Sequence, residues 1–491
     1  MLVRRLVQPR AVQVARTKGQ GLIRTRASLL SRCPHSPLPQ ARKLFFMAGE
    51  IRMFSTMTSS PPGAGLARSS NTGTSGFVKH HIKLDGGKQI TYEAFEGSME
   101  KPLIDKREYK LIRLENGLEA LLIHDPEADK ASAAMDVRVG HLSDPEGLYG
   151  MAHFCEHLLF MGTKKYPREN EYSEYLSNHS GSSNAFTSLE NTNYFFDVGY
   201  AHFEGALDRF AQFFLEPLFD PSCSEREIRA VDSEHKKNLQ SDLWRSFQLD
   251  KSLSNPSHPY SKFGTGNLAT LWEKPREMGL DIRDELLKFH ERYYSANMMK
   301  LVVLGRESTA KLTEWVAEKF SNVPNKQCDV PSFPGSPLSD RELGTQVLFR
   351  TIKDVRLLDI TFPFPEQADL YRSKPGQLLS HLIGHEGHGS LFSCLKQRGW
   401  ANLLSAGSAI HAKGFELFKI NIDLTHEGYE HYGDVVAAVF QYIDMLRAKP
   451  IEQWLYEEVQ RLSELRFIFK EKSSPAMYSL SLIHISEPTR P

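Results

Sequence analysis

The alternation of hydrophobic and polar positions predicts two successive blocks of mixed strands and helices. In the first block, two runs rich in apolar residues, at 110–114 and 118–123, flank Asn116-Gly117, the strongest short signal for a β-hairpin. The stretch 147–161 is apolar on most faces, as expected of a buried helix. Further strands are predicted at 131–139, 185–187, 194–198 and 300–304, and further helices at 202–215, 225–243 and 309–321.

A Pro- and Gly-rich stretch at 331–337 predicts the start of the second block. Strands are expected there at 346–350, 356–362 and 416–423, and helices at 376–397 and 429–447. Runs of strands mixed with helical runs indicate an α+β class, with a largely antiparallel sheet packed against helices, and not a strictly alternating parallel sheet.

Composition narrows the function classes. The 491 residues are 40% hydrophobic and 24% charged, enough for two or three packed domains. Lys+Arg and Asp+Glu both number 60, so nothing favours a nucleic-acid partner. The five cysteines are odd in number and form no CxxC pair, which favours a reducing compartment. No apolar run reaches the ~18 residues of a membrane span, so a soluble chain is expected.

Both ends of the chain are unusual. Residues 1–49 hold eight Arg, two Lys and no acid. The leader 1–53 is therefore either a mitochondrial transit peptide or an extension bypassed by a later start codon, and the protein is expected in the cytosol, with a mitochondrial form left open. The Ser/Thr/Gly/Pro-rich part of 54–104 predicts a flexible linker. At the other end, 480–491 resembles a translated sequencing adapter, so we expect natural sequence to stop near Ser479.

The candidate chemistry lies in His153-x-x-Glu156-His157, inside the helix predicted at 147–161. Two histidines four residues apart on a helix share a face and can both reach one Zn²⁺ at ~2.0–2.1 Å. Glu156 lies on the same side, where it can take a proton from a water that the metal activates. The alternative is a core helix whose two histidines only form hydrogen bonds.

A catalytic zinc needs a third protein ligand. The predicted helix at 225–243 offers Glu227 and Glu234, seven residues apart and thus on one face. Their spacing does not choose between them. A solvated acidic face is the alternative.

Several longer strings resemble one known family. His153–Thr163 (HFCEHLLFMGT), Gly181–Ser188 (GSSNAFTS), Ala230–His235 (AVDSEH) and Asn255–Asn267 (NPSHPYSKFGTGN) resemble the inverted zinc metallopeptidases of family M16, which include insulin-degrading enzyme and the fungal a-factor pheromone-processing metallopeptidases. The resemblance runs from about Asp105 to Tyr478. It implies two tandem LuxS/MPP-like domains, a catalytic one at 105–330 and a second, truncated one at 331–479.

The resemblance also implies roles for individual residues. His153, His157 and Glu234 match the zinc ligands, Glu156 the base, and Glu227 a carboxylate that orients a zinc histidine. Asn184 and Ala185 match the edge strand that takes up substrate as an added β-strand. The residues that match the lining of the substrate pocket are Phe160, Phe186, Trp244 and Phe247, each of which could equally be an ordinary core aromatic.

In the second block, His381, Gly384, Glu386 and Leu404 match an exosite that anchors a substrate's N-terminus away from the zinc. The chain departs from the family pattern nearby, because Ala406 and Ser408 stand where Gly and Gln are usual.

The sequence thus predicts a zinc metalloendopeptidase that degrades or processes short or unfolded peptides of hormone or pheromone type, with one Zn²⁺ per chain. The resemblance places part of the oxyanion machinery in a C-terminal half that this chain lacks, so the chain is expected to bind zinc and hydrolyse peptides poorly. Homo-oligomerisation is left open. The alternatives are a non-catalytic scaffold subunit of the same fold and an enzyme of the mitochondrial processing peptidase type.

Overall fold

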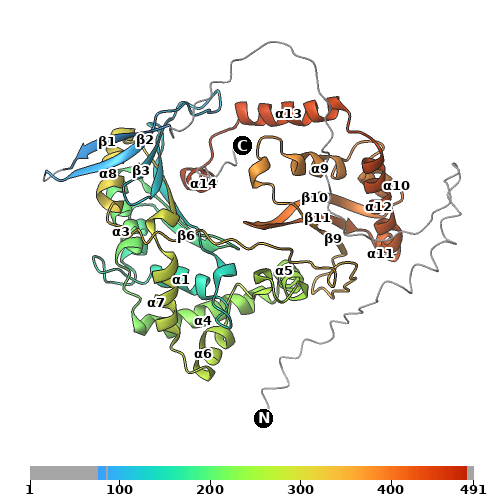
Figure 1. Ribbon diagram of the computed structural model, residues 1–491, viewed down its shortest axis with the longest axis horizontal. Helices are drawn as coiled ribbons and strands as arrows, with labels where there is room; N and C mark the ends of the chain where they lie inside the picture. The colour runs from blue at the N-terminus through green and yellow to red at the C-terminus, as the bar shows by residue number, and fades with distance from the viewer. Residues whose placement is uncertain (1–75, 85–86, 484–491) are drawn as a thin grey trace. The chain divides into compact units, whose positions relative to one another are not determined.

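Figure 1 shows the chain in a computed structural model that describes residues 76–84 and 87–483. The basic leader 1–53 and most of the adapter-like tail lie outside the described residues. The adapter origin of 480–491 stays a prediction. Leu338–Arg350 groups separately from the remaining described chain and consists of turns and irregular backbone. The domain boundary at 330/331 stays a prediction.

The first part of the chain forms a mixed eight-stranded sheet in the order β1-β2-β3-β4-β8-β5-β7-β6. The pairing of β4 with β8 is parallel, and all other pairings are antiparallel. The strands are β1 (Phe77–Lys83), β2 (Gln89–Phe95), β3 (Glu108–Leu114), β4 (Glu119–His124), β5 (Lys130–Val137), β6 (Ser182–Thr187), β7 (Thr192–Gly199) and β8 (Met299–Gly305).

The central strands are apolar on both faces because both faces are covered. On β4, Ala120 and Leu122 belong to the main core, whereas Leu121 and Ile123 belong to a second cluster on the opposite face. Helices cover the main-core face, and α14 (Pro475–Ser481) packs against β5, β7 and β8 on the other. A strand buried on both sides shows a continuous hydrophobic run instead of alternation.

The predicted hairpin is present as β3 and β4, which pair from Glu108 opposite His124 to Arg113 opposite Glu119. Gly117 has φ +85°, which explains why glycine suits the turn. The prediction of a flexible linker over 54–104 is wrong for 77–83 and 89–95, which form β1 and β2. In β2 the buried side chains alternate, and they add to the main core.

The helices of this part differ from prediction mainly at their ends. The helix expected at 147–161 is α1 (Met151–Leu159), which starts late because Gly150 has φ +92°. The helix expected at 225–243 is two helices, since the chain breaks at 239–241. The set is α1, α2 (Glu171–Asn178), α3 (Phe203–Leu215), α4 (Pro221–Asn238), α5 (Asp242–Leu253), α6 (Lys274–Glu277), α7 (Ile282–Tyr293) and α8 (Thr309–Phe320).

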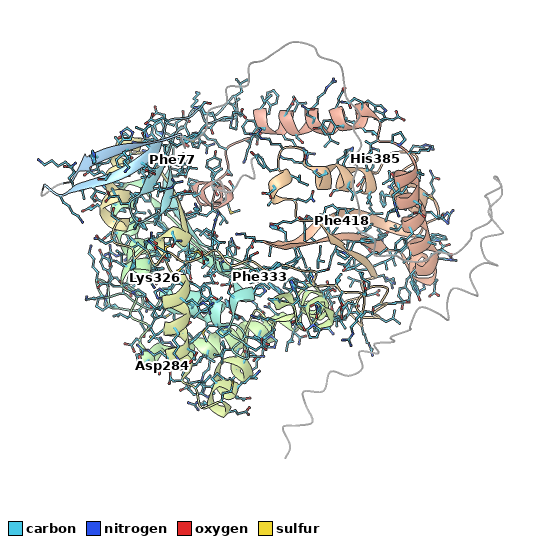
Figure 2. All side chains as sticks on the ribbon, in the orientation of Figure 1. Phe77, Asp284, Lys326, Phe333, His385 and Phe418 are labelled. Carbon is cyan, nitrogen blue, oxygen red and sulfur yellow. The ribbon has the colours of Figure 1, made fainter. Side chains whose placement is uncertain are left out.

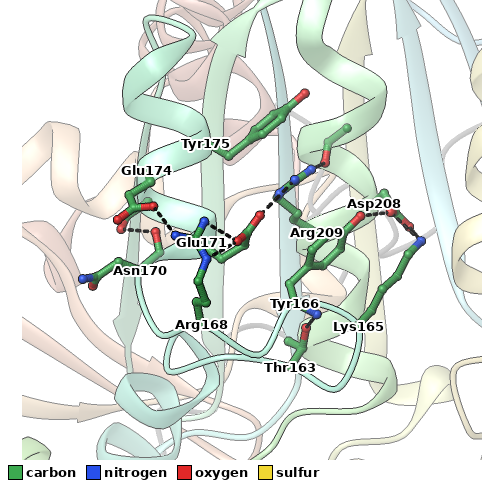
Figure 3. Close-up of polar contacts among 12 residues, drawn as sticks. Thr163, Lys165, Tyr166, Arg168, Asn170, Glu171, Glu174, Tyr175, Asp208 and Arg209 are labelled. Atoms are coloured by element: carbon green, nitrogen blue, oxygen red, sulfur yellow. Dashed lines mark hydrogen bonds and ion pairs between the residues drawn. The ribbon is translucent and has the colours of Figure 1, made fainter.

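A polar network fastens the loop after α1 to α3 (Figure 3). Arg209 of α3 donates to Glu171 at 3.1 Å, and Asp208 accepts from Lys165 at 2.6 Å and from the hydroxyl of Tyr166. A single exposed ion pair typically stabilises the folded state by only ~0–1 kcal/mol. A network that links several charges is the case in which such pairs matter for stability. The network fixes the path of the chain after α1, the helix that carries His153 and His157.

The second part forms a three-stranded antiparallel sheet in the order β10-β11-β9, with its own core. Phe418, labelled in Figure 2, is one of the buried side chains of this core. The elements are β9 (Leu357–Phe364), β10 (Ala401–Ala412), β11 (Phe415–Leu424), α9 (Pro375–Ile383), α10 (Leu391–Gln397), α11 (His426–Glu430), α12 (Tyr432–Ala448) and α13 (Gln453–Ile468). The next helix, α14, packs on the first sheet.

Two predictions fail in this part. Residues 346–350 form no strand in the described chain, and Leu348 is 53% exposed, so their apolar run finds no sheet to join. The helix expected at 376–397 is interrupted at Gly384 and resumes as α10. The mixture of sheets and helices confirms the α+β class. Among the described residues, no helix has both the length and the apolar character needed to cross a bilayer.

Candidate metal centre

Helix α1 presents the three motif residues on one side. The rings of His153 and His157 lie 4.8 Å apart, nearly perpendicular to each other. Glu156 is between them in sequence and is 6% exposed. Both histidines are only partly exposed, so α1 buries its apolar face in the main core while its motif face remains reachable from solvent.

Helix α4 packs against α1 and supplies two carboxylates. Oε2 of Glu234 lies 3.4 Å from Nε2 of His153 and 3.9 Å from Nε2 of His157. Oε2 of Glu227, almost two turns earlier, lies 3.2 Å from Nδ1 of His157. The two acids therefore approach opposite nitrogens of one ring, and only Glu234 faces both Nε2 atoms.

Each histidine is held through its Nδ1 atom. Nδ1 of His153 lies 2.8 Å from the backbone carbonyl oxygen of Thr265, which can only accept a hydrogen bond. Nδ1 of His157 lies at hydrogen-bonding distance from Glu227. Because Nδ1 donates in both cases, each Nε2 keeps its lone pair for a metal.

Glu156 has its own hydrogen-bond donor. The hydroxyl of Thr187, the last residue of β6, donates to Oε2 of Glu156 at 2.6 Å. Burial raises the pKa of Glu156 to about 7, against the opposing effects of the Thr187 hydrogen bond and the charge of His157. A carboxylate with a pKa near neutrality is well suited to accept and return a proton.

The donor set fits a divalent metal. Ligand atoms of His153, His157 and Glu234 all lie within 4.8 Å of one another. Two imidazoles and one carboxylate are the three-ligand pattern of a catalytic zinc site. Burial and the neighbouring His157 lower the pKa of His153, which favours the neutral, metal-binding form. For His157, burial acts to lower the pKa but the hydrogen bond to Glu227 and the nearby carboxylates outweigh it and raise the pKa.

The predicted substrate strand lies at the edge of the first sheet. Asn184 and Ala185 belong to β6, which pairs with β7 on one side and is the last strand in the sheet order. Asn184 is exposed, and Phe186 is 40% exposed on the same strand. Among the described residues, β6 is therefore an unpaired edge, and it ends at Thr187, which bonds Glu156.

The other predicted pocket residues lie in two places, one at the border of the main core and two on α5. Phe160 packs on Phe213, with ring centroids 5.1 Å apart, and borders the main core, so it serves at least as a core aromatic. Trp244 and Phe247 lie together on α5, with ring centroids 6.2 Å apart, and Trp244 is 47% exposed. Their role in substrate binding stays a prediction.

The predicted exosite residues gather around α9 and β10. His381 is in the last turn of α9, and a Cβ on Gly384 would come 3.8 Å from the amide nitrogen of Ala406 in β10. Glu386 is exposed in the following loop. Leu404 is 3% exposed and belongs to the second core, so its side chain is not available to a ligand.

Two site residues were missed by the sequence-based prediction. Thr187 and Thr265 lie inside strings that carry the family resemblance, yet neither residue type indicates catalytic chemistry by itself. Thr265 acts through its carbonyl oxygen, which every residue has, and so leaves no signal in side-chain chemistry. Only the approach of distant segments brings Thr187 to Glu156 and Thr265 to His153.

Two family models match the chain. Residues 119–257 match the model described as insulinase (peptidase family M16), and residues 281–463 match the one described as peptidase M16 inactive domain. The chain belongs to peptidase family M16. The family resemblance predicted from the sequence is confirmed.

Comparisons with individual proteins lead to the same family. The chain is 54% identical to human insulin-degrading enzyme over 381 residues, which are 78% of this chain and 37% of that protein. It is 51% identical to the A-factor-processing enzyme of Saccharomyces cerevisiae over 391 residues, 80% of this chain and 38% of that protein. The crystal structure of pitrilysin matches with a TM-score of 0.77 at 34% identity, covering 80% of this chain and 42% of that one. The chain thus spans less than half the length of these M16 relatives.

Glu227→Gln is expected to weaken zinc binding about 10–100-fold, the usual effect of losing a carboxylate that supports a metal-binding histidine. The amide keeps the shape but loses the charge that holds the Nδ1 proton of His157. Competition with a chelator of known zinc affinity measures the change. Glu225→Gln is the matched control, because Glu225 is an exposed residue of the same helix that pairs with Arg229. Equal affinities for the wild type and Glu227→Gln would contradict the assigned role.

Proposed function

We propose that this chain carries the catalytic zinc site of a metalloendopeptidase that acts on short or unfolded peptides. The observation that supports this most is the convergence of His153, His157 and Glu234 within 4.8 Å, with the buried carboxylate of Glu156 beside them. The M16 relatives include enzymes named for degrading insulin and processing a-factor. Peptide substrates of hormone or pheromone type are part of the proposal.

The proposed chemistry divides among a few groups. His153, His157 and Glu234 would hold one Zn²⁺, which when bound acts as a Lewis acid and brings the pKa of a water towards ~7. Glu156 accepts a proton as the water attacks the peptide carbonyl, and returns it to the leaving nitrogen. Thr187 orients the carboxylate of Glu156, and Thr265 and Glu227 orient the imidazoles.

β6 is proposed as the platform for substrate. An extended peptide that pairs with the free edge of β6 would use main-chain hydrogen bonds, which depend little on sequence. Because β6 ends at Thr187, a peptide paired along Asn184 and Ala185 would run towards Glu156. This arrangement favours segments that are extended or unfolded over folded proteins.

A metal-and-activity experiment tests the proposal. The purified chain is expected to bind one zinc ion, and its hydrolysis of a fluorogenic peptide is expected to stop when a chelator removes the metal and to return when zinc is added. A chain that takes up no zinc at micromolar concentration would refute the proposal. A slow rate alone would not, because the chain spans 37% of the human relative.

Thr187→Val is expected to lower the rate of hydrolysis about tenfold, as follows from losing a hydrogen bond to a charged group. The Thr187 hydrogen bond lowers the pKa of Glu156, so its loss should move the acid limb of the rate–pH profile to higher pH. Thr187→Ser keeps the hydroxyl and is the control. A pH profile identical in wild type and Thr187→Val would show that the hydroxyl does not tune the base.

The compartment and assembly state are proposed from the family and the chain together. We propose a cytosolic protein, with mitochondrial import of a form that retains the basic leader. The proposed partners are peptides and the remaining portion of an M16 protein of the usual length. One relative, from Arabidopsis thaliana, is named as peroxisomal.

A further inference from the structure

Two polar side chains next to the metal centre take no part in the chemistry above. The first is Asp144, which is 1% exposed and lies just before α1. Its Oδ2 accepts from the amide of Gly150 at 2.6 Å, and its Oδ1 accepts from the amide of Ala152 at 2.9 Å. Asp144 thus satisfies free amides at the start of the helix that carries His153, where a negative charge is also favourable.

The second is Lys262, which opens the loop that contains Thr265. Its Nζ donates to the carbonyl oxygen of Leu142 at 2.9 Å and to that of Asp144 at 2.7 Å. Two bonds from one ammonium group therefore tie the start of the loop to the segment that caps α1. Three residues later, the carbonyl of Thr265 accepts from Nδ1 of His153.

The loop and the helix start are in close contact. A Cβ built on Gly150 would lie 2.2 Å from the Cα of Gly266, so the two backbones touch. Behind them, Nζ of the fully buried Lys251 lies 2.5 Å from Nε2 of His141, which extends the polar cluster to α5. The segments that meet at His153 thus have little room to move independently.

We propose that Asp144 and Lys262 form a positioning pair that fixes the contact between Nδ1 of His153 and the carbonyl of Thr265, and with it the direction in which His153 presents Nε2 to the metal. Asp144 fixes the helix side of that contact, and Lys262 fixes the loop side. This inference rests on the proposed zinc site. It adds two residues that affect the metal without touching it.

Zinc affinity and the tautomer of His153 are the readouts, both measured on the full chain. Lys262→Met keeps the apolar stem and removes both bonds, and it is expected to weaken zinc binding at least tenfold, as loss of an outer support does. Long-range ¹H–¹⁵N NMR of the metal-free protein is expected to show a single Nδ1–H tautomer for His153 in the wild type and a mixture in Lys262→Met. Lys262→Arg keeps donors for both carbonyls and should restore most of the affinity.

Lys300→Met is the matched control. The side chain of Lys300 on β8 is 14% exposed, and its Nζ donates to Glu119 of β4 at 2.5 Å, outside the cluster around Asp144 and Lys262. It should lower the melting temperature without changing zinc affinity. If Lys300→Met weakens zinc binding as much as Lys262→Met, general destabilisation explains the effect and the proposal fails.

Asp144→Asn provides a second route to the same contact if Lys262→Met does not fold. The amide keeps the shape of the side chain but leaves one of the two helix amides facing another donor, so weaker zinc binding and mixed tautomers are expected again. Affinities within twofold of the wild type, with an intact Nδ1–H tautomer, would overturn the proposal. A wild type that binds no zinc would instead refute the proposed function, and the two failures are distinguishable.

Discussion

Replacing Glu156 with glutamine is expected to abolish peptide hydrolysis while leaving zinc bound. The amide is nearly the same size and can still accept the hydrogen bond from Thr187, so the site should keep its shape. It cannot accept a proton at neutral pH. A positioned general base typically contributes ~10²–10⁴-fold to the rate, and a loss within or beyond this range is expected.

The measurement combines metal analysis with turnover of a fluorogenic peptide at high protein concentration. Glu216→Gln is the control, because Glu216 is an exposed carboxylate that pairs with Lys164 at the surface. Removing the buried charge should not lower the melting temperature of Glu156→Gln, since burying a carboxylate is costly. Retained turnover would show that another group is the base.

Glu234→Ala is expected to reduce zinc affinity by more than the ~10–100-fold that loss of an outer support causes. The carboxylate is the third donor, and the two imidazoles alone do not complete a catalytic site. Glu234 is 43% exposed as a side chain, so its removal creates no cavity, and the folded state should be unaffected.

The comparison with Glu227→Gln makes this prediction specific. If the roles are as assigned, the affinity order is wild type, then Glu227→Gln, then Glu234→Ala. Lys237→Ala, at an exposed position on the same helix, is the control for changes in α4. The reverse order would exchange the roles of ligand and support between the two acids.

Much of the fold follows from local patterns. The hairpin of β3 and β4 was predictable because Asn116-Gly117 sets the turn and the flanking strands are apolar. Strand β8 was predictable from its short, continuous apolar run, and helix α8 from its helical pattern of apolar positions. The failures lie where the pattern is short or interrupted, as at 346–350, or where a strand is amphipathic and partly exposed, as at 77–83 in β1. β1 is stabilised by pairing with its neighbour β2, and the local sequence of 77–83 does not show this contact.

The sequence by itself determined that two imidazoles and a carboxylate share one face of α1, because helical geometry links positions 153, 156 and 157 wherever the helix lies. It also determined that Glu227 and Glu234 share a face of α4. Which of the two acids approaches the Nε2 atoms was decided only by the packing of α4 on α1, since an imidazole has two nitrogens on different sides of its ring. Glu227 meets Nδ1 of His157 and Glu234 meets Nε2. The supports from Thr187, Thr265, Asp144 and Lys262 likewise depend on segments that are far apart in the chain, and no local pattern encodes such meetings.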